Sequence, residues 1–300
     1  MSRIRNVAFL CLGVMGGPMA GHLARAGLSV AVYNRTGDRA WAWAEAHSDF
    51  DVSVAATPAQ AAREAEIVFV CTGADSDLRD IALGDEGALG AMSSGSLFVD
   101  HTTASATIAR ELAAVAEKRG IGFLDAPVSG GQAGAEQGTL TIMLGGDEAN
   151  YLRLAPILDH YAKKHLLLGP VGQGQLTKMV NQICIAGLVQ ALSEGLNFAD
   201  RVGLDATRVV EVISQGAAGS WQMENRAQTM IEGRFDFGFA VDWMRKDLAM
   251  AIEEAGRVSA PLPITELVDA RYQEIQEHGG GRLDTSSLIL GLTRTADEPE

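Results

Sequence analysis

The first half of the chain alternates short apolar runs with longer segments whose apolar residues recur at helical spacing. A continuous apolar run such as Ile67–Cys71 is typical of a strand that is buried on both faces. Alternation of strands and helices predicts crossover connections and a mostly parallel, doubly wound α/β sheet. The expected strands are Val7–Leu12, Ser29–Tyr33, Ile67–Cys71, Leu97–Asp100, Phe123–Asp125 and Thr139–Leu144. The expected helices include Pro18–Ala26 and Ile108–Arg119, with Gly120 as the C-cap of the second.

The pattern changes after Gly169-Pro170. The segment Gln175–Val202 contains no proline and keeps a helical apolar period, which predicts one helix roughly 40 Å long. Further helices are expected at Ala206–Ser214, Trp221–Ile231, Trp243–Arg257 and Ile264–Glu277, and a frayed acidic tail at Thr295–Glu300. The chain therefore divides into a dinucleotide-type domain, residues 1–169, and an all-helical domain for substrate and oligomerisation, residues 170–300, linked by the long helix.

Composition narrows the class of partner. The chain has 300 residues, of which 47% are hydrophobic and 21% charged, and its net charge is -14, which argues against nucleic acid or an anionic membrane surface. Cys11, Cys71 and Cys184 lack metal-ligand spacing and lie in apolar runs, so we interpret them as buried thiols in a reducing cytoplasm and expect no metal. The run Val7–Leu12 is too short for a secretion signal, and no stretch reaches the ~18 apolar residues of a membrane span. A cytoplasmic location is expected.

The turn from Cys11 to Gly16 (Cys-Leu-Gly-Val-Met-Gly) stands between an expected strand and an expected helix, as a dinucleotide-binding turn requires. Gly13 lets the backbone approach a pyrophosphate, and Gly16 lets the helix pack against the strand. Cys11 replaces the usual first glycine, so we expect it in the β region with an inert thiol. The alternative is a tight turn of an unrelated α/β protein.

The end of the second strand indicates which dinucleotide binds. An NAD-binding unit usually carries an acid there for the ribose 2′-OH, whereas this chain reads Asn34-Arg35-Thr36. The Arg35 guanidinium and the Thr36 hydroxyl suit a 2′-phosphate, which favours NADP(H) over NAD(H). The alternative is an ordinary arginine of a surface loop.

Three further segments carry candidate chemistry: Asp125–Gly131, Gly172–Gln182 and Lys246–Leu248. Adjacent glycines after Ser129 expose N–H groups that can hold a carboxylate. Lys178 shares a helix face with Asn181 and Gln182, and a buried lysine suits proton transfer. Read alone, Lys178 is a solvated helix lysine and the two amides belong to a helix surface. The coincidence of the segments favours a site.

Together these motifs resemble the β-hydroxyacid dehydrogenase family, over nearly the whole chain from Val7 to about Leu288. The resemblance implies a Rossmann-type domain, a helical domain and homodimers or homotetramers. It makes Lys178 the catalytic proton donor or acceptor. It places the substrate carboxylate at Ser129, Gly130 and Gly131, with Asn181 and Gln182 also contacting substrate. The implied cofactor contacts are Leu12, Gly13, Val14, Met15, Gly16, Asn34, Arg35, Thr36, Thr72, Gly73, Thr103 and Lys246.

The sequence departs from the family pattern at two places. Thr72-Gly73 stands where many members have Leu-Pro, and Gln182 stands where some members have Asn. In the related 6-phosphogluconate dehydrogenases a glutamate follows the lysine by seven residues, whereas this chain has Ile185, which disfavours decarboxylation of a sugar phosphate. Lys178 argues against the imine reductases of this fold, which lack it. His101 is interpreted as structural.

The leading hypothesis is an NADP(H)-dependent oxidoreductase that interconverts a small 3-hydroxy acid and its semialdehyde or oxo acid. One alternative is a carbonyl reductase of aldehydes or ketones without a carboxylate. The other is a non-catalytic nicotinamide-binding module.

Overall fold

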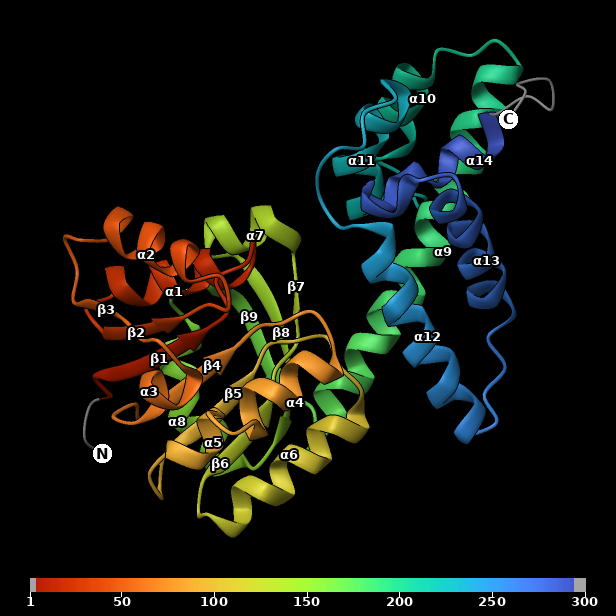
Figure 1. The fold of residues 1–300 in the computed structure, drawn as a ribbon. Coiled ribbons are helices and arrows are strands. Elements are labelled where there is room, and N and C mark those ends of the chain that lie inside the picture. The colour runs from red at the N-terminus through yellow and green to blue at the C-terminus, as the bar shows by residue number, and fades with distance from the viewer. Residues whose placement is uncertain (1–3, 294–300) are drawn as a thin grey trace. The chain divides into compact units, whose positions relative to one another are not determined.

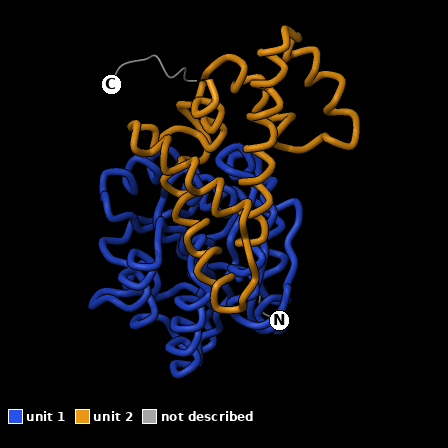
Figure 2. Tube along the Cα trace, turned by 90° about the vertical axis from the view of Figure 1, so that its right-hand side faces the viewer, with its two compact units in different colours: residues 1–178 blue, residues 179–300 orange. Residues whose placement is uncertain are grey.

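The computed structural model describes residues 4–293, so the expected tail Thr295–Glu300 lies outside the described range. Two compact units divide the chain, with the break between Lys178 and Met179 (Figure 2). This break falls inside helix α9, Gln173–Arg201, which begins in the first unit. The boundary predicted at residue 169 corresponds to the loop just before that helix.

The first unit is built on a sheet whose strand order is β3-β2-β1-β4-β5-β6-β8-β7, with β9 also paired to β8 (Figure 1). The strands are β1 Asn6–Leu10, β2 Ser29–Tyr33, β3 Val52–Val54, β4 Ile67–Val70, β5 Leu97–Asp100, β6 Gly122–Asp125, β7 Val128–Ser129, β8 Leu140–Gly146 and β9 Ala162–Leu167. Pairing is parallel from β3 to β6, whereas β8 runs antiparallel to β6 and β7. The order from β3 to β6 is that of a dinucleotide-binding Rossmann sheet, and it reverses at β1 and β4, where such sheets bind ligands.

Helices cover both faces of this sheet, so alternate residues of each central strand enter two separate cores. Val7 and Phe9 of β1 pack in one core and Ala8 and Leu10 in the other. The helices are α1 Gly16–Arg25, α2 Gly37–Ala46, α3 Pro58–Ala62, α4 Asp75–Leu83, α5 Ala88–Ala91, α6 Ala106–Lys118, α7 Gly131–Gln137 and α8 Glu148–Leu158. Burial on both faces explains the continuous apolar run of β4.

The named elements of the second unit, within its described part, are all helices or 3-10 turns. This unit contains the rest of α9 with α10 Ala206–Ile213, α11 Trp221–Ile231, α12 Val241–Arg257, α13 Pro263–Glu277 and α14 Leu290–Thr293, besides the 3-10 turns η1 Gly280–Arg282 and η2 Thr285–Ile289. Residues of α9, α12 and α13 form one core. Residues nearer the C-terminal end of α9 pack with α11 in a second core. The predicted fold class is confirmed.

The structure also corrects the sequence reading. Strands β3, β7 and β9 were not expected, because the first two have 3 and 2 residues and β9 begins Ala-Lys-Lys, with no apolar run. The expectation of three buried thiols is wrong for Cys184, which is exposed, while Cys11 and Cys71 are partly buried. In residues 4–293 no helix is long and apolar enough to cross a membrane. The same residues contain no cluster of three or more His, Cys, Asp or Glu side chains suited to a metal ion.

Candidate active site

The turn after β1 depends on one glycine that tolerates no side chain. A Cβ on Gly16 would overlap the carbonyl oxygen of Cys11, whereas a Cβ on Gly13 would meet nothing within 4 Å. Gly16 therefore lets α1 pack close to β1, and Gly13 leaves the surface of the turn open. Pro18 lies in the first turn of α1, where its missing N–H is not needed. This open backbone fits the close approach of a pyrophosphate.

The expectation that Cys11 lies in the β region is wrong, because its φ is 75°. Its N–H donates to the carbonyl of Tyr33 at 2.8 Å, continuing the contact with β2, while its own carbonyl turns onto Gly16. Left-handed backbone at a non-glycine residue costs about 1–2 kcal/mol. Burial, with a contribution from Asp77 and against that of Arg35, raises the pKa of the Cys11 thiol to about 12. A thiol with that pKa is protonated at neutral pH, as expected for an inert side chain.

The predicted cofactor residues after β2 differ in what they contact. Asn34 joins two turns, since its Oδ1 accepts from the N–H of Leu12 at 3.0 Å and its Nδ2 donates to the carbonyl of Thr36 at 3.0 Å. Arg35 is 85% exposed, and its Nη1 lies 3.1 Å from Oδ1 of Asp77. Asn34 therefore shapes the turn, and Arg35 supplies an exposed charge beside it.

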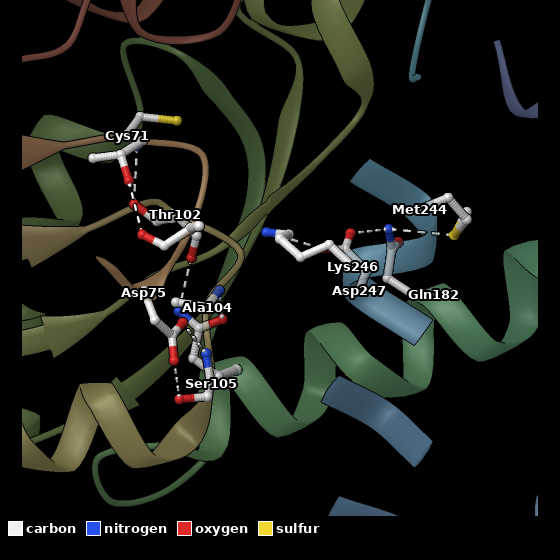
Figure 3. Close-up of polar contacts among 12 residues, drawn as sticks. Cys71, Asp75, Thr102, Ala104, Ser105, Gln182, Met244, Lys246 and Asp247 are labelled. Atoms are coloured by element: carbon white, nitrogen blue, oxygen red, sulfur yellow. Dashed lines mark hydrogen bonds and ion pairs between the residues drawn. The ribbon is translucent and has the colours of Figure 1, made fainter. Parts of the chain in front are cut away.

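The loops after β4 and β5 are tied to each other. The N–H of Thr72 donates to Oγ1 of Thr102 at 3.0 Å. Asp75, at the start of α4, accepts from the N–H of Ser105 at 2.9 Å and from its Oγ at 2.6 Å (Figure 3). The predicted contacts Thr72 and Gly73 thus lie in a braced loop. Among the residues that make these hydrogen bonds, only Ser105 could have been found from the sequence, because serine is a preferred N-cap and Ser105 caps α6.

A buried glutamine that sequence reasoning missed holds the segment around Thr103. Gln175 donates from Nε2 to the carbonyl of Thr102 at 2.8 Å, and its Oε1 accepts from the N–H of Ala104 at 3.0 Å. Its side chain comes from the first turn of α9, so the loop after β5 is fastened to the beginning of that helix. Thr103, predicted near the cofactor, lies between the two anchored residues.

The start of α9 is fixed by a carboxylate from β6. Asp125 accepts from the N–H of Gly172 at 2.7 Å and from that of Gln175 at 2.9 Å. Burial raises the pKa of Asp125 to about 6, against the lowering effect of these hydrogen bonds. A Cβ on Gly174 would lie 2.6 Å from the carbonyl oxygen of Met143, so the helix starts in close contact with β8. This junction orients the first turns of α9, which carry Lys178.

The predicted carboxylate loop lies where β7 meets α7. Ser129 pairs with Thr141 of β8. Gly130 and Gly131 have φ of 133° and 62°, conformations that L side chains rarely adopt. Gly131 begins α7, so successive backbone N–H groups gather at this turn. Backbone N–H groups that converge at such a turn can hydrogen-bond an anion.

In the second unit, Asp247 links two predicted residues, Gln182 and Lys246 (Figure 3). Gln182 donates to Oδ2 of Asp247 at 2.7 Å and accepts from Nδ2 of Asn181 at 2.8 Å. Lys246 lies with its Nζ 3.2 Å from Oδ1 of Asp247, which is buried. No pattern in the sequence predicts this role of Asp247. Lys178, which is buried, precedes Gln182 on α9 by four residues and shares its helix face.

His101, which we interpreted as structural, is enclosed in the core of the first unit. Its Nδ1 donates to the carbonyl of Ala126 at 2.6 Å, and its ring stacks on Phe69 at 5.7 Å. Burial lowers its pKa to about 4. The imidazole is therefore neutral at physiological pH and stays outside the mechanism.

Comparison with known proteins identifies families that match both parts of the chain. Residues 6–169 match the family described as the NAD binding domain of 6-phosphogluconate dehydrogenase. Residues 172–292 match the family described as the NAD-binding region of NADP-dependent 3-hydroxyisobutyrate dehydrogenase. Together the two matches span both units.

Individual relatives are similar over almost their whole length. An uncharacterised oxidoreductase of Shewanella frigidimarina is 57% identical, covering 97% of this chain and 99% of its own. The 2-hydroxy-3-oxopropionate reductase of Escherichia coli is 35% identical, covering 97% and 98%. The structure of a 3-hydroxyisobutyrate dehydrogenase of Mycobacterium tuberculosis with L-serine superposes with a TM-score of 0.87 at 31% identity, covering 97% of this chain and all of that one. The chain belongs to the β-hydroxyacid dehydrogenase family and is an NAD(P)-dependent dehydrogenase or reductase acting on CH–OH groups.

Proposed function

We propose that the protein interconverts a small 3-hydroxy acid and its semialdehyde or oxo acid with NADP(H). The observation that carries the proposal is the turn at Ser129–Gly131, where two left-handed glycines begin a helix. Its N–H groups and the Ser129 hydroxyl suit a substrate carboxylate. The names of the Escherichia coli and Mycobacterium tuberculosis relatives also refer to hydroxy or oxo acids.

Lys178 is the proposed proton donor in reduction and acceptor in oxidation, at the oxygen of the reacting carbon. The dinucleotide, when bound, supplies or accepts the hydride. Because the Asp125 carboxylate fixes the start of α9, the Lys178 backbone is held in place. A positioned general acid contributes typically 10²–10⁴-fold, to which the electrostatic effect of a cation beside the developing alkoxide is added.

Asn181 is proposed to donate to the substrate. Gln182, whose amide bonds to Asp247 and Asn181, is proposed to help hold Asn181 in place. Lys246, held by Asp247, is the proposed contact to the nicotinamide end of the cofactor. Homodimers or homotetramers remain a prediction.

The cofactor proposal uses residues of the first unit. Leu12–Gly16 are proposed to receive the pyrophosphate, and Arg35 with Thr36 the 2′-phosphate of NADP(H). Open space over Gly13 and the exposed Arg35 guanidinium support this assignment. Thr72, Gly73 and Thr103 are proposed contacts on the braced loops.

The carboxylate requirement is tested with matched substrates. Methylmalonate semialdehyde and 2-methylpropanal, like succinic semialdehyde and butanal, differ only by a carboxylate in place of a methyl group. We expect kcat/KM with NADPH to be about ten to a hundred times higher for the acid of each pair, because charged hydrogen bonds contribute ~1.5–3 kcal/mol. Equal values within each pair would favour the carbonyl reductase without a carboxylate requirement.

The role of Lys178 is tested on the best substrate of that panel. Lys178→Ala should lower kcat by several orders of magnitude while the Kd of NADPH changes less than about threefold. Ser129→Ala should instead raise KM for the acid and leave KM for the uncharged aldehyde unchanged. A Lys178→Ala enzyme with near wild-type kcat contradicts the mechanism.

A further inference from the structure

The arginine proposed for the 2′-phosphate already has an acidic partner in the fold. Nη1 of Arg35 lies 3.1 Å from Oδ1 of Asp77. Arg35 follows β2, whereas Asp77 lies in the first turn of α4, which follows β4. The two residues are 42 positions apart in the chain, so no local motif records their contact.

The ion pair lies at the dinucleotide end of the sheet. Strands β2 and β4 both pair with β1, one on each side. A contact between the segments that follow β2 and β4 therefore spans the end of β1, where the glycine turn begins. Consistent with this placement, the charges of Asp77 and Arg35 both shift the pKa of the Cys11 thiol, in opposite directions.

We propose that Asp77 is a specificity-determining residue for the cofactor, whose carboxylate competes with the 2′-phosphate for Arg35 and so restrains the preference for NADP(H) over NAD(H). The inference rests on the proposed contact between Arg35 and the 2′-phosphate. A phosphate that binds the guanidinium must displace this carboxylate or accept a like charge close by, which is unfavourable. NAD(H) has no 2′-phosphate and is not affected.

The two side chains permit such an exchange. Arg35 is 85% exposed and Asp77 is 37% exposed, and exposed ion pairs are typically weak. The carboxylate can therefore turn away from the guanidinium without disturbing the core. The sequence reading of Asn34-Arg35-Thr36 as a site without an acid is incomplete, since the fold brings one to Arg35.

The experiment measures Kd for NADPH and NADH by fluorescence titration, without any substrate. Asp77→Asn is compared with Asp80→Asn, which removes the same charge from an exposed residue of the same helix, three positions farther on. We expect Asp77→Asn to lower the Kd of NADPH about three- to tenfold at low salt, with NADH changing less than about twofold. Asp80→Asn should leave the ratio of the two Kd values near wild type, and added salt should shrink the gain.

Arg35→Ala separates this inference from the cofactor proposal. If Arg35→Ala weakens NADPH binding but Asp77→Asn leaves the ratio of the NADPH Kd to the NADH Kd unchanged or raises it, the competition is overturned and the Arg35 contact stands. If Arg35→Ala leaves the ratio unchanged, the 2′-phosphate contact itself fails, and the inference with it. In the Arg35→Ala background, Asp77→Asn should change the Kd of NADPH no more than Asp80→Asn does. If Asp77→Asn still lowers the Kd of NADPH by the full three- to tenfold there, competition for Arg35 is contradicted.

Discussion

His101 accepts a hydrogen bond at Nε2 from the hydroxyl of Tyr161 at 2.8 Å, in the interior of the first unit. The other ring nitrogen donates to a backbone carbonyl, which assigns the proton to Nδ1. A protonated ring would place a second N–H against this network in a buried site. The Tyr161 hydroxyl can donate only to a neutral ring, and burial disfavours the charged ring, so the fold is sensitive to acid.

We predict that His101 loses its stabilising effect as the pH falls. Its folded pKa is about 4, below the ordinary 6.5, so the effect is complete above pH 6.5 and disappears toward pH 4. The stability advantage of the wild type over His101→Gln should shrink by about 3 kcal/mol between pH 7 and 4, measured by urea denaturation. Parallel pH profiles of the two proteins would rule this out.

The effect of Asp100, the preceding residue, on stability should change with pH in the opposite direction. Burial raises its pKa from 3.8 to about 7, against the hydrogen bonds from Thr102. Its contribution to stability is present below pH 3.8 and is lost as the pH rises toward 7. The unfolding free energy of Asp100→Asn should therefore rise by about 4 kcal/mol relative to that of the wild type between pH 4 and 7, in the same urea denaturation series. A constant difference between the two proteins contradicts the raised pKa.

The junction between β6 and α9 should depend on a carboxylate rather than an amide. Asp125→Asn places an amide donor against one of the N–H donors of Gly172 and Gln175, so we expect a loss of about 2 kcal/mol in unfolding free energy. Asp147→Asn is the matched control. Asp147 caps α8 with Oδ1 alone and Asn caps equally well, so its change should stay below about 0.5 kcal/mol. Equal effects of the two variants would show that the second acceptor of Asp125 is dispensable.

The two glycines of the turn after β1 should respond differently to alanine. Gly16→Ala forces a Cβ onto the carbonyl of Cys11, so we expect a loss of at least about 2 kcal/mol in unfolding free energy. Gly13→Ala meets open space and should fold with near wild-type stability, while its Cβ weakens NADPH binding about tenfold or more. Thermal unfolding and fluorescence titration separate the two effects. Unchanged NADPH affinity in Gly13→Ala would disprove the pyrophosphate contact.

Thiol alkylation should follow exposure and pKa. Cys184 is exposed, whereas the Cys11 thiol has its pKa raised to about 12. Iodoacetamide at pH 8 should label Cys184 first and leave Cys11 unmodified in the folded protein, as peptide mass spectrometry would record. Cys184→Ser should abolish the fast phase, and fast labelling of Cys11 contradicts its burial.

Local patterns determine much of this protein. The apolar runs of β1, β4 and β5 predict a buried parallel sheet, because burial on both faces favours apolar side chains at successive positions. Helical periodicity predicts α9 and the helices after it, with ends within a few residues of those observed. The glycine turn and the segments around Ser129 and Lys178 are contiguous, so the family and its class of reaction follow from the sequence.

Other features depend on contacts between residues far apart in the chain, which no periodicity encodes. Gln175 bonds to the residues on either side of Thr103, 71 positions away along the chain in the case of Ala104, and Asp125 of β6 holds the start of α9 across 47 positions. Cys11 is left-handed at a point where its carbonyl lies against Gly16, although Cys by itself favours negative φ. The segment Asn34-Arg35-Thr36 contains no acidic residue, but in the fold the order of β2, β1 and β4 brings Asp77 within ion-pair distance of Arg35.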